Sequence, residues 1–357
     1  MGTKRSRRVA IFADNLNVGG IQKSLVNILG SGALDGYEAD VFLFSKETFF
    51  DLSAMGANIH LHFLKPLPYW YRGIPFGILY RLHKPDPEMM RYSYDVAIDF
   101  DSYQNATALG ALQVRAKKRV MWIHNDMQIK LKEEPKYAFL WRMMRGKYKY
   151  YTEFAAVSQG IVEPFRQASG RNDCPVYVIP NLIDTGEIFR RCGEEPQTKV
   201  DNAKLNIASM GRLCHQKGFD LMLPDIQKVY AQRQDIACYI IGDGPDRQVL
   251  EQQVKDLGLE QVVHFTGNLP NPFPVLKQMD VFCLESRYEG QGMVLWEAKA
   301  LGLELVFSKR LEKYNPSLTG TEDVVGDLLK AQKRQKTMDD LSDYNGHIQQ
   351  QLKLLLQ

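Results

Sequence analysis

Two glutamates in a glycine-rich segment carry the strongest chemical signal in the sequence. Glu289 and Glu297 lie in SRYEGQGMVLWEAKALG, residues 286–302, directly after a short apolar run. A carboxylate accepts hydrogen bonds without donating any, so such a pair suits the hydroxyl groups of a ribose or a hexose. Gly290 and Gly292 allow a ligand to approach the backbone closely. An isolated pair of glutamates is more often exposed surface charge, so the interpretation depends on the surroundings.

The same segment predicts a strand, a loop and then a helix that begins at Met293. The free N–H groups at the start of a helix favour an anion, so a phosphate or sugar oxygen fits there. Glu297 lies on this helix with its side chain leaning back toward the N-terminus, so both carboxylates can face the mouth of a cleft. We expect ligand contacts from the residues at the helix start: Gly290, Gln291, Gly292, Met293 and Val294.

A basic segment upstream, SMGRLCHQKGFDLM at residues 209–222, ends a predicted strand and supplies Arg212 and Lys217. Two cations beside a helix N-terminus can clamp a diphosphate, although the segment could also be a basic surface loop. Two further turns follow apolar strands, and each alone predicts only a turn. They contain Gly242, Asp243 and Gly244, and then Thr266, Gly267 and Asn268.

These motifs follow short apolar runs that alternate with helical patterns, which is typical of parallel α/β sheets. The pattern occurs twice, and ligands of such sheets bind beyond the carboxyl ends of the strands. The first set of predicted strands is 8–13, 39–44, 59–63, 95–100, 119–124, 154–158 and 176–180. The second set is 205–211, 236–242, 262–267, 280–285 and 304–308.

The sequence therefore predicts two Rossmann-like domains, covering residues 1–190 and 191–336. Residues 185–203 are polar without a sustained period, as expected of a connection between domains. The tail, 337–357, is predicted to be a helix with Ile348, Leu352 and Leu355 on one face.

Composition supports a globular protein of two domains. The chain has 357 residues, of which 45% are hydrophobic and 24% charged, which argues against disorder. Its five cysteines lack metal-ligand spacing, and it contains neither a signal-peptide core nor a membrane-spanning apolar run. We therefore expect a cytoplasmic protein. Met1, Gly2 and Ser6 match the loose myristoylation pattern, which arises often by chance.

The order and spacing of the second-domain motifs resemble retaining glycosyltransferase family four, of the GT-B architecture. Its two Rossmann-like domains face each other across a deep cleft. The resemblance is close from residue 206 to about 302, where Glu289 and Glu297 match the E-x7-E signature. It implies that Glu289 contacts the transferred sugar and Glu297 the ribose. It also implies that Arg212 and Lys217 hold the diphosphate, with the loops at 242–244 and 266–268 near the ribose and base.

The first domain resembles the family less closely. NVGGIQKSL places Gly19 and Gly20 where the family brings backbone against donor phosphate or acceptor, although a simple tight turn has the same pattern. WIHND places His124 like the family's active-site histidine, which approaches the transferred sugar, although a lone histidine is more often a packed or surface residue. IPNLID, residues 179–184, resembles a family marker to which we assign a structural role.

One segment departs from the family. SKRLEKYNPSLTG, residues 308–320, replaces the frequent second glycine pair and acidic residue, so the resemblance predicts no donor contact there. The stretch still resembles a subgroup associated with bacterial surface polysaccharides. The tail, 337–357, resembles the GT-B helix that crosses back to the first domain, which implies that it packs there.

The resemblance implies transfer of a hexose-type sugar from a nucleotide-sugar, and UDP is the nucleotide expected from its frequency in the family. It also implies that the anomeric configuration is retained. Members of the family have no agreed enzymic nucleophile. We expect no cofactor and no metal, because Arg212 and Lys217 can neutralise the leaving diphosphate. Asp99 and Asp101 form an Asp-x-Asp string, but it lies in the first domain, outside the donor half. His124 is expected to position the sugar and not to act as a general base.

The acceptor is expected to be a glycan or a lipid-linked molecule. Residues 115–149 carry eleven Lys/Arg against three Asp/Glu, interleaved with Trp122, Tyr137, Phe139, Trp141 and Tyr148. With residues 66–94, this stretch suits peripheral contact with the inner face of the cell membrane. A solvated helix face with the aromatic residues in the core explains it equally well. Charge alone would also fit nucleic acid, which we do not expect as a partner.

Other protein classes fit less well. A dinucleotide-dependent dehydrogenase needs G-x-G-x-x-G after the first strand, and Gly19-Gly20 does not supply it. Another GT-B enzyme, such as a nonhydrolysing epimerase or a phosphorylase, stays open because architecture does not determine the reaction. A noncatalytic partner subunit would have lost the sugar-contacting groups, which this chain retains.

Overall fold

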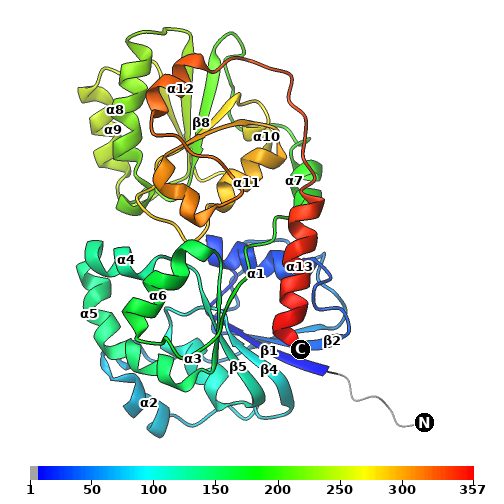
Figure 1. Ribbon diagram of the computed structural model, residues 1–357. Coiled ribbons are helices and arrows are strands. Elements are labelled where there is room, and N and C mark those ends of the chain that lie inside the picture. Colours follow the sequence, from blue (N-terminus) through cyan, green and yellow to red (C-terminus); the bar gives the residue numbers. More distant parts are fainter. Residues whose placement is uncertain (1–6) are drawn as a thin grey trace. The chain divides into compact units, whose positions relative to one another are not determined.

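The computed structural model describes residues 7–357, so the myristoylation pattern lies outside the described residues. The chain forms two compact units (Figure 1). Unit 1 contains the residues up to 182 together with 343–357, and unit 2 contains 183–342. Each unit is described by itself. Within residues 7–357, no helix is both long and apolar enough to cross a bilayer.

Unit 1 is built on a seven-stranded sheet in the order β3-β2-β1-β4-β5-β6-β7, with every neighbouring pair parallel. Its strands are β1 (Arg7–Ala13), β2 (Tyr37–Leu43), β3 (Ile59–Phe63), β4 (Ser93–Asp99), β5 (Arg115–Ile123), β6 (Glu153–Ala156) and β7 (Val176–Val178). Its α-helices are α1 (Gly20–Gly30), α2 (Phe76–Leu82), α3 (Asn105–Gln113), α4 (Met127–Glu133), α5 (Pro135–Met144), α6 (Val162–Ser169) and α13 (Ser342–Leu356). Short 3-10 turns are η1 (Tyr69–Gly73), η2 (Arg145–Tyr150) and η3 (Gln159–Ile161).

Unit 2 is built on a five-stranded parallel sheet in the order β10-β9-β8-β11-β12. Its strands are β8 (Leu205–Met210), β9 (Ile236–Ile241), β10 (Val263–Gly267), β11 (Val281–Leu284) and β12 (Glu304–Phe307). Its α-helices are α7 (Thr185–Arg191), α8 (Phe219–Tyr230), α9 (Arg247–Asp256), α10 (Phe273–Leu276), α11 (Met293–Ala300) and α12 (Val324–Lys330). The 3-10 turns are η4 (His215–Lys217) and η5 (Lys309–Tyr314).

All twelve predicted strands are present, and the α/β prediction is confirmed. Some strands are apolar along their whole length, because helices cover both faces of a parallel sheet. In β9, for example, all six residues of IACYII are buried. The largest shift in a boundary is at β5, which begins at Arg115 instead of Arg119.

The expected connection between domains differs from the structure. Part of it is α7, which belongs to unit 2. The chain therefore passes from unit 1 to unit 2 between residues 182 and 183, upstream of the predicted boundary near 190. Asp184 caps α7 by accepting a hydrogen bond from the Glu187 N–H, at 2.8 Å. Ile188 and Cys192 are buried one helical turn apart. The polar composition of the segment concealed this narrow apolar stripe.

The marker IPNLID ties the end of unit 1 to α1. The Asn181 side-chain oxygen accepts a hydrogen bond from the Ser24 hydroxyl at 2.6 Å. The Asn27 amide donates to the carbonyl oxygen of Leu182, also at 2.6 Å. Both donors are buried on α1, so these contacts hold the chain in place where it leaves unit 1.

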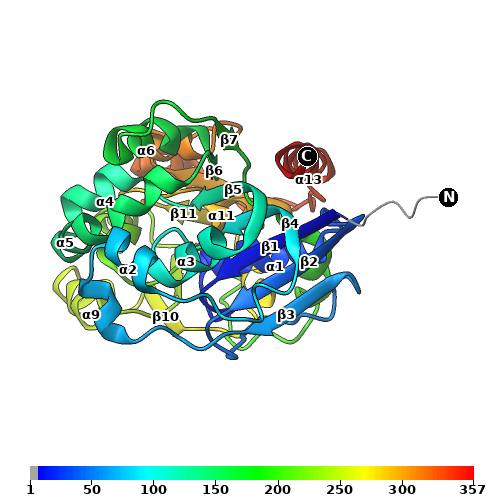
Figure 2. The same cartoon turned by 90° about the horizontal axis from the view of Figure 1, so that it is seen from below.

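The tail forms α13, which packs on unit 1 and is seen end-on in Figure 2. Ile348, Leu352 and Leu355 are buried, as the helical spacing predicts. The Gln349 amide donates to the carbonyl oxygen of Ser31 at 3.0 Å, and the Tyr344 hydroxyl donates to that of Asn181 at 3.0 Å. The helix begins at Ser342, five residues later than the predicted segment.

Each sheet has a point where the strand order reverses, between β1 and β4 in unit 1 and between β8 and β11 in unit 2. In doubly wound sheets, ligands bind beside the loops that leave the carboxyl ends of the two strands at such a point. In unit 2 these are the loops that carry Lys217 and Glu289.

Candidate functional site

The two loops at the reversal point of unit 2 are bonded to each other. The Arg287 N–H donates to the carbonyl oxygen of Gln216 at 2.8 Å, and the Gln216 amide donates to that of Tyr288 at 3.1 Å. Lys217 Nζ lies 2.7 Å from Glu289 Oε1. These contacts connect consecutive residues of one loop to consecutive residues of the other, so the lysine and the carboxylate are held side by side.

Arg287 reinforces the same junction. Its guanidinium donates to both carboxylate oxygens of Asp220, at 2.7 and 2.6 Å, and to the carbonyl oxygen of His215 at 2.8 Å. The two-pronged hydrogen bonds from Arg287 lower the pKa of Asp220 below its usual value. Because Asp220 lies in the first turn of α8, the loop before Glu289 is attached to the start of that helix.

The Lys217–Glu289 pair is shielded from solvent. Glu289 is only 4% exposed, and the Lys217 side chain is 19% exposed. Glu289 is therefore not the exposed surface charge that an isolated glutamate usually is. A buried carboxylate next to an ammonium group presents an acceptor for hydroxyl groups beside a cation for phosphate oxygens.

Two glycines allow the backbones of neighbouring strand ends to touch. Gly218 adopts φ +64°, and a Cβ there would overlap the carbonyl oxygen of Glu285. Gly242 adopts φ +134°, and a Cβ there would overlap the carbonyl oxygen of Gly211. Both positions combine a left-handed backbone with a close approach, so only glycine fits without movement. The loops after β8, β9 and β11 are thus packed against one another at the backbone.

The predicted helix begins at Met293, as expected. Gly290, Gln291 and Gly292 are buried ahead of it, and Val294 is half-buried. Glu297 is 8% exposed on this helix and makes interactions within the protein. It is therefore not a solvated helix charge.

The remaining predicted groups of unit 2 are more open. Arg212 is exposed, directly after Gly211 at the end of β8. The Asp243 carboxylate accepts a hydrogen bond from the N–H of Gly244 at 2.7 Å, and it lies 3.4 Å from Arg247 Nη1. In the other turn, the Thr266 hydroxyl donates to the carbonyl oxygen of Gly267 at 3.0 Å, and Asn268 is exposed.

In unit 1, His124 lies in an aromatic setting directly after β5. It is buried, and its Nε2 lies 2.7 Å from the carbonyl oxygen of Phe100. Burial lowers the pKa of His124 to about 3. A carbonyl can only accept, so Nε2 carries the proton and Nδ1 of the neutral ring is an acceptor. The ring is thus suited to orienting a hydroxyl group and not to carrying positive charge.

The Asp-x-Asp string lies at the end of β4, beside the reversal point of unit 1. Asp99 and Asp101 are buried, and burial raises their pKa values to about 6 and about 7. The Tyr151 hydroxyl donates to Asp99 Oδ2 at 3.0 Å, while fully buried Lys147 donates to the carbonyl oxygen of Gln104 at 2.9 Å. Within residues 7–357, no group of three or more His, Cys, Asp or Glu side chains is arranged to hold a metal ion.

Gly19 and Gly20 lie at the start of α1, with Gly19 as its N-terminal cap. A Cβ at Gly20 would meet open space, and one at Gly19 would meet only the movable end of the Gln22 side chain. Neither glycine is required by packing in this structure. The turn leaves room beside the carboxyl end of β1.

Two family models match this chain. The "Glycosyltransferase Family 4" model matches residues 18–187, and the "Glycosyl transferases group 1" model matches residues 194–314. These matches fall on unit 1 and unit 2 in turn. The chain belongs to the GT-B glycosyltransferases. The matched part of unit 2 includes the loops that hold Lys217 and Glu289.

Curated relatives of this GT-B glycosyltransferase are similar at low identity. An uncharacterized glycosyltransferase of Haemophilus influenzae is 23% identical over 84% of this chain and 80% of the relative. The lipopolysaccharide core biosynthesis glycosyltransferase LpsD of Rhizobium meliloti is 32% identical over 45% of each chain. An uncharacterized glycosyltransferase of Methanocaldococcus jannaschii is 22% identical, and the match spans 60% of its length.

Solved GT-B structures share the fold over nearly the whole chain. Staphylococcus aureus TarM in complex with fondaparinux, α-GlcNAc-glycerol and UDP has a TM-score of 0.64, with 11% identity over 98% of this chain and 97% of TarM. Anabaena HepE in complex with UDP and glucose has a TM-score of 0.59, with 16% identity over 98% of this chain and 94% of HepE.

Several residues that build the site were not predicted. Arg287, Asp220 and Gln216 hold the two loops together, and none of them belongs to a family signature that we recognised. An acidic residue in the first turn of a helix is common, so Asp220 gave no distinctive signal. Arg287 lies two residues before Glu289, shortly after a buried strand. A charged residue at that place was the sequence feature that could have marked it as part of the site.

Proposed function

We propose that this protein transfers a hexose-type sugar from a UDP-sugar to a glycan or lipid-linked acceptor, with retention of anomeric configuration and without a metal ion. Its place is in the synthesis of cell-surface polysaccharide. The Lys217–Glu289 pair at the reversal point of unit 2 carries the proposal. HepE, with UDP and glucose, and LpsD, of lipopolysaccharide core biosynthesis, support the classes of donor and product.

The donor is held by unit 2. Arg212 and Lys217 neutralise the diphosphate, and this cationic charge replaces a metal ion as the bond to the sugar breaks. Glu289 accepts hydrogen bonds from sugar hydroxyls, and Glu297 accepts them from the ribose. The loops at 242–244 and 266–268 lie near the ribose and base.

The transfer step needs no enzymic nucleophile. The acceptor hydroxyl attacks the anomeric carbon from the face that the leaving diphosphate occupies, so configuration is retained. The bond from that carbon to the phosphate oxygen breaks, and the hydroxyl proton passes to the departing diphosphate. His124 is neutral, so it serves this step by orienting a sugar hydroxyl through Nδ1.

A donor screen tests the proposal. Purified protein is incubated with a panel of nucleotide-sugars, with and without glycan or lipid-diphosphate acceptors, and released nucleoside diphosphate is measured in buffer containing EDTA. Acceptor-dependent release from a UDP-sugar, with an α-linked product from an α-linked donor, is the expected result. Epimerised donor without acceptor would identify an epimerase instead, and no turnover with any donor would identify a noncatalytic subunit.

Peripheral membrane contact is part of the proposal, but through fewer aromatic residues than the sequence predicts. Within 115–149, Phe139 is exposed, whereas the other four predicted aromatic residues are buried. The apolar core required them, as the alternative interpretation stated. α5 packs against η1 and η2, and α2 packs against η2. The exposed apolar side chains on α2, η1 and α5 are Trp70, Ile78, Leu82 and Phe139. Exposed basic residues on these elements, on α4, on η2 and in the adjoining loops are Arg81, Lys84, Lys132, Lys136, Arg142, Arg145 and Lys149.

Apolar and basic side chains together suit the surface of an anionic bilayer. Vesicle sedimentation at low salt tests this contact. Wild type should sediment with phosphatidylglycerol vesicles and not with phosphatidylcholine vesicles, and the Ile78→Glu/Leu82→Glu variant should lose binding. Val249→Glu is the matched control, because Val249 is an exposed apolar residue of unit 2. Equal sedimentation of both variants would disprove this contact surface.

A further inference from the structure

The segment that departs from the family, residues 308–320, lies directly beside the donor loop of unit 2. It follows β12, and the Ser308 N–H donates to the carbonyl oxygen of Leu284 at 3.2 Å, at the end of β11. Its first residues form η5. The departure therefore occurs on an element that adjoins the loop from Glu285 to Gly292, which is called the donor loop below.

Arg310 on η5 bonds the first two residues of the donor loop. Its Nη2 donates to the carbonyl oxygen of Glu285 at 2.6 Å, and its Nε donates to that of Ser286 at 2.9 Å. One rigid, permanently charged fork thus holds two consecutive carbonyls. These residues directly precede Arg287 and Tyr288, which bond the loop after β8.

The donor loop is consequently held from both sides. On the β8 side, Arg287 and Gln216 attach it to the loop of Lys217, and the Gly218 backbone packs against the Glu285 carbonyl. On the β12 side, Arg310 attaches its base. The β8-side contacts reach as far as Glu289, whereas the Arg310 contacts end at Ser286.

The Glu285 carboxyl group adds an electrostatic reason for a cation at this place. Glu285 is buried, and its Oε2 lies 3.4 Å from the Ser308 hydroxyl and 4.0 Å from Arg310 Nη2. Burial, together with the nearby Asp225, raises the pKa of Glu285 to about 7, although Arg310 acts in the opposite direction. Arg310 therefore stabilises the charged form of a carboxyl group at the foot of the donor loop.

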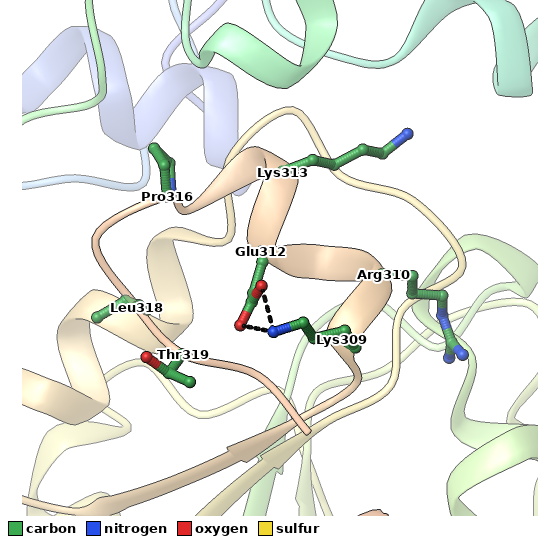
Figure 3. Close-up of a pocket in the computed structure, with 7 residues that line it drawn as sticks. All are labelled: Lys309, Arg310, Glu312, Lys313, Pro316, Leu318 and Thr319. Carbon is green, nitrogen blue, oxygen red and sulfur yellow. Dashed lines mark hydrogen bonds and ion pairs between the residues drawn. The ribbon is translucent and has the colours of Figure 1, made fainter. Parts of the chain in front are cut away.

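Figure 3 shows how differently the cations of η5 are used. Lys309 pairs with Glu312 at 2.8 Å, on the wall of an open cavity of about 670 Å³. The Arg310 side chain points away from that ion pair. Lys309 is thus a neighbouring cation of the same turn that bonds Glu312 and not the donor loop.

We infer that Arg310 is a positioning residue for the nucleotide-sugar, holding the base of the donor loop so that the loop is already ordered when the diphosphate binds. Arg310 lies in the segment where the family resemblance predicts a glycine pair and an acidic residue. It bonds the donor loop from the β12 side, opposite the contacts from the β8 side. The inference rests on the proposed function for the identity of the ligand. It does not rest on that function for the order of the loop.

The experiment compares Arg310→Gln and Arg310→Lys with the control Lys309→Gln. Calorimetry with UDP, steady-state kinetics and hydrogen exchange of the amides in 285–292 are measured on the full chain. Arg310→Gln should weaken UDP binding and raise the donor KM about ten- to fifty-fold, because two charge-assisted hydrogen bonds are lost. The kcat should fall less than about three-fold, since the β8-side contacts still place Glu289. Exchange in 285–292 should rise at least about ten-fold.

Arg310→Lys keeps the charge but not the fork, so it should recover part of the UDP affinity, and Lys309→Gln should stay within about two-fold of wild type. Wild-type UDP affinity and wild-type exchange in Arg310→Gln would overturn the inference. So would an equal loss in Lys309→Gln, which would reflect net charge alone. If wild type binds neither UDP nor any nucleotide-sugar, the proposed function fails, and the exchange comparison still decides whether Arg310 orders the loop. If Arg310→Gln does not fold, Arg310→Lys decides by the same two readouts.

Discussion

The loops beside the reversal points of the two sheets differ in how their charged side chains are paired and buried. In unit 2, Lys217 and Glu289 are bonded to each other, and Arg212 beside them is exposed. In unit 1, Asp99 and Asp101 are buried with pKa values raised to about 6 and about 7, and His124 is neutral. In unit 2 a carboxylate and an ammonium group are bonded to each other, whereas in unit 1 burial shifts the pKa values of Asp99, Asp101 and His124 toward their uncharged forms.

This difference suits two kinds of ligand. Charged groups that are already oriented can stabilise a diphosphate without reorganising. Such electrostatic stabilisation is usually the largest single contribution to catalysis. Neutral, buried polar groups offer hydrogen bonds to hydroxyl groups and repel little. Under the proposed function, unit 2 would bind the charged part of a nucleotide-sugar and unit 1 would bind hydroxyl-rich groups.

The largest expected effect comes from removing charge in unit 2. Glu289→Ala and Arg212→Ala should each lower kcat/KM by about 10³-fold or more, because each removes a group that is set against charge or hydroxyls of the donor. Thermal unfolding of each variant, measured in parallel, should stay close to wild type. Glu260→Ala is the control, since Glu260 is an exposed residue of unit 2 outside the site. Near-normal turnover in either site variant would refute the site assignment.

A smaller effect is expected from His124 in unit 1. His124→Asn should lower kcat/KM about 10–100-fold, because one hydroxyl-orienting group is lost. The pH profile between pH 5.5 and 8 should keep its shape, since a histidine with a pKa of about 3 does not titrate in this range. A limb near pH 6.5 that is present in wild type and absent from the variant would show that the ring carries a proton during catalysis.

The smallest expected effect is on stability, at Asp101. Its folded pKa of about 7 exceeds the ordinary value of 3.8, so the folded state binds more protons, and stability falls as pH rises from about 4 to about 7. Asp101→Asn removes this loss. Calorimetric unfolding should show the variant gaining roughly 2–3 kcal/mol over wild type between pH 5 and pH 8. A constant difference over this range would mean that Asp101 is ionised throughout.

The sequence was sufficient for the fold because each strand is a short apolar run that ends in a turn, as at Ile236–Ile241. It also singled out Glu289 and Lys217, which the structure brings together, and their role in binding a donor stays a prediction. It missed α7, whose apolar stripe contains little more than Ile188 and Cys192.

The sequence could not predict which charges are buried. Lys147 lies in a basic stretch and was counted with its surface, yet it is fully buried beside Asp99 and Asp101. Arg310 contacts residues 24 and 25 positions away in the sequence, and its partners are backbone carbonyls, which carry no residue signature. Contacts of this kind depend on tertiary packing and not on local pattern.

The position of α13 has a consequence for how the protein is made. Residues 343–357 complete unit 1, yet the ribosome translates them only after all of unit 2. Domains generally fold as units while synthesis proceeds from the N-terminus. Unit 2 can fold as soon as its own residues emerge. The surface of unit 1 that receives Ile348, Leu352 and Leu355 stays uncovered until these residues are made. A chaperone could bind that apolar surface during this time.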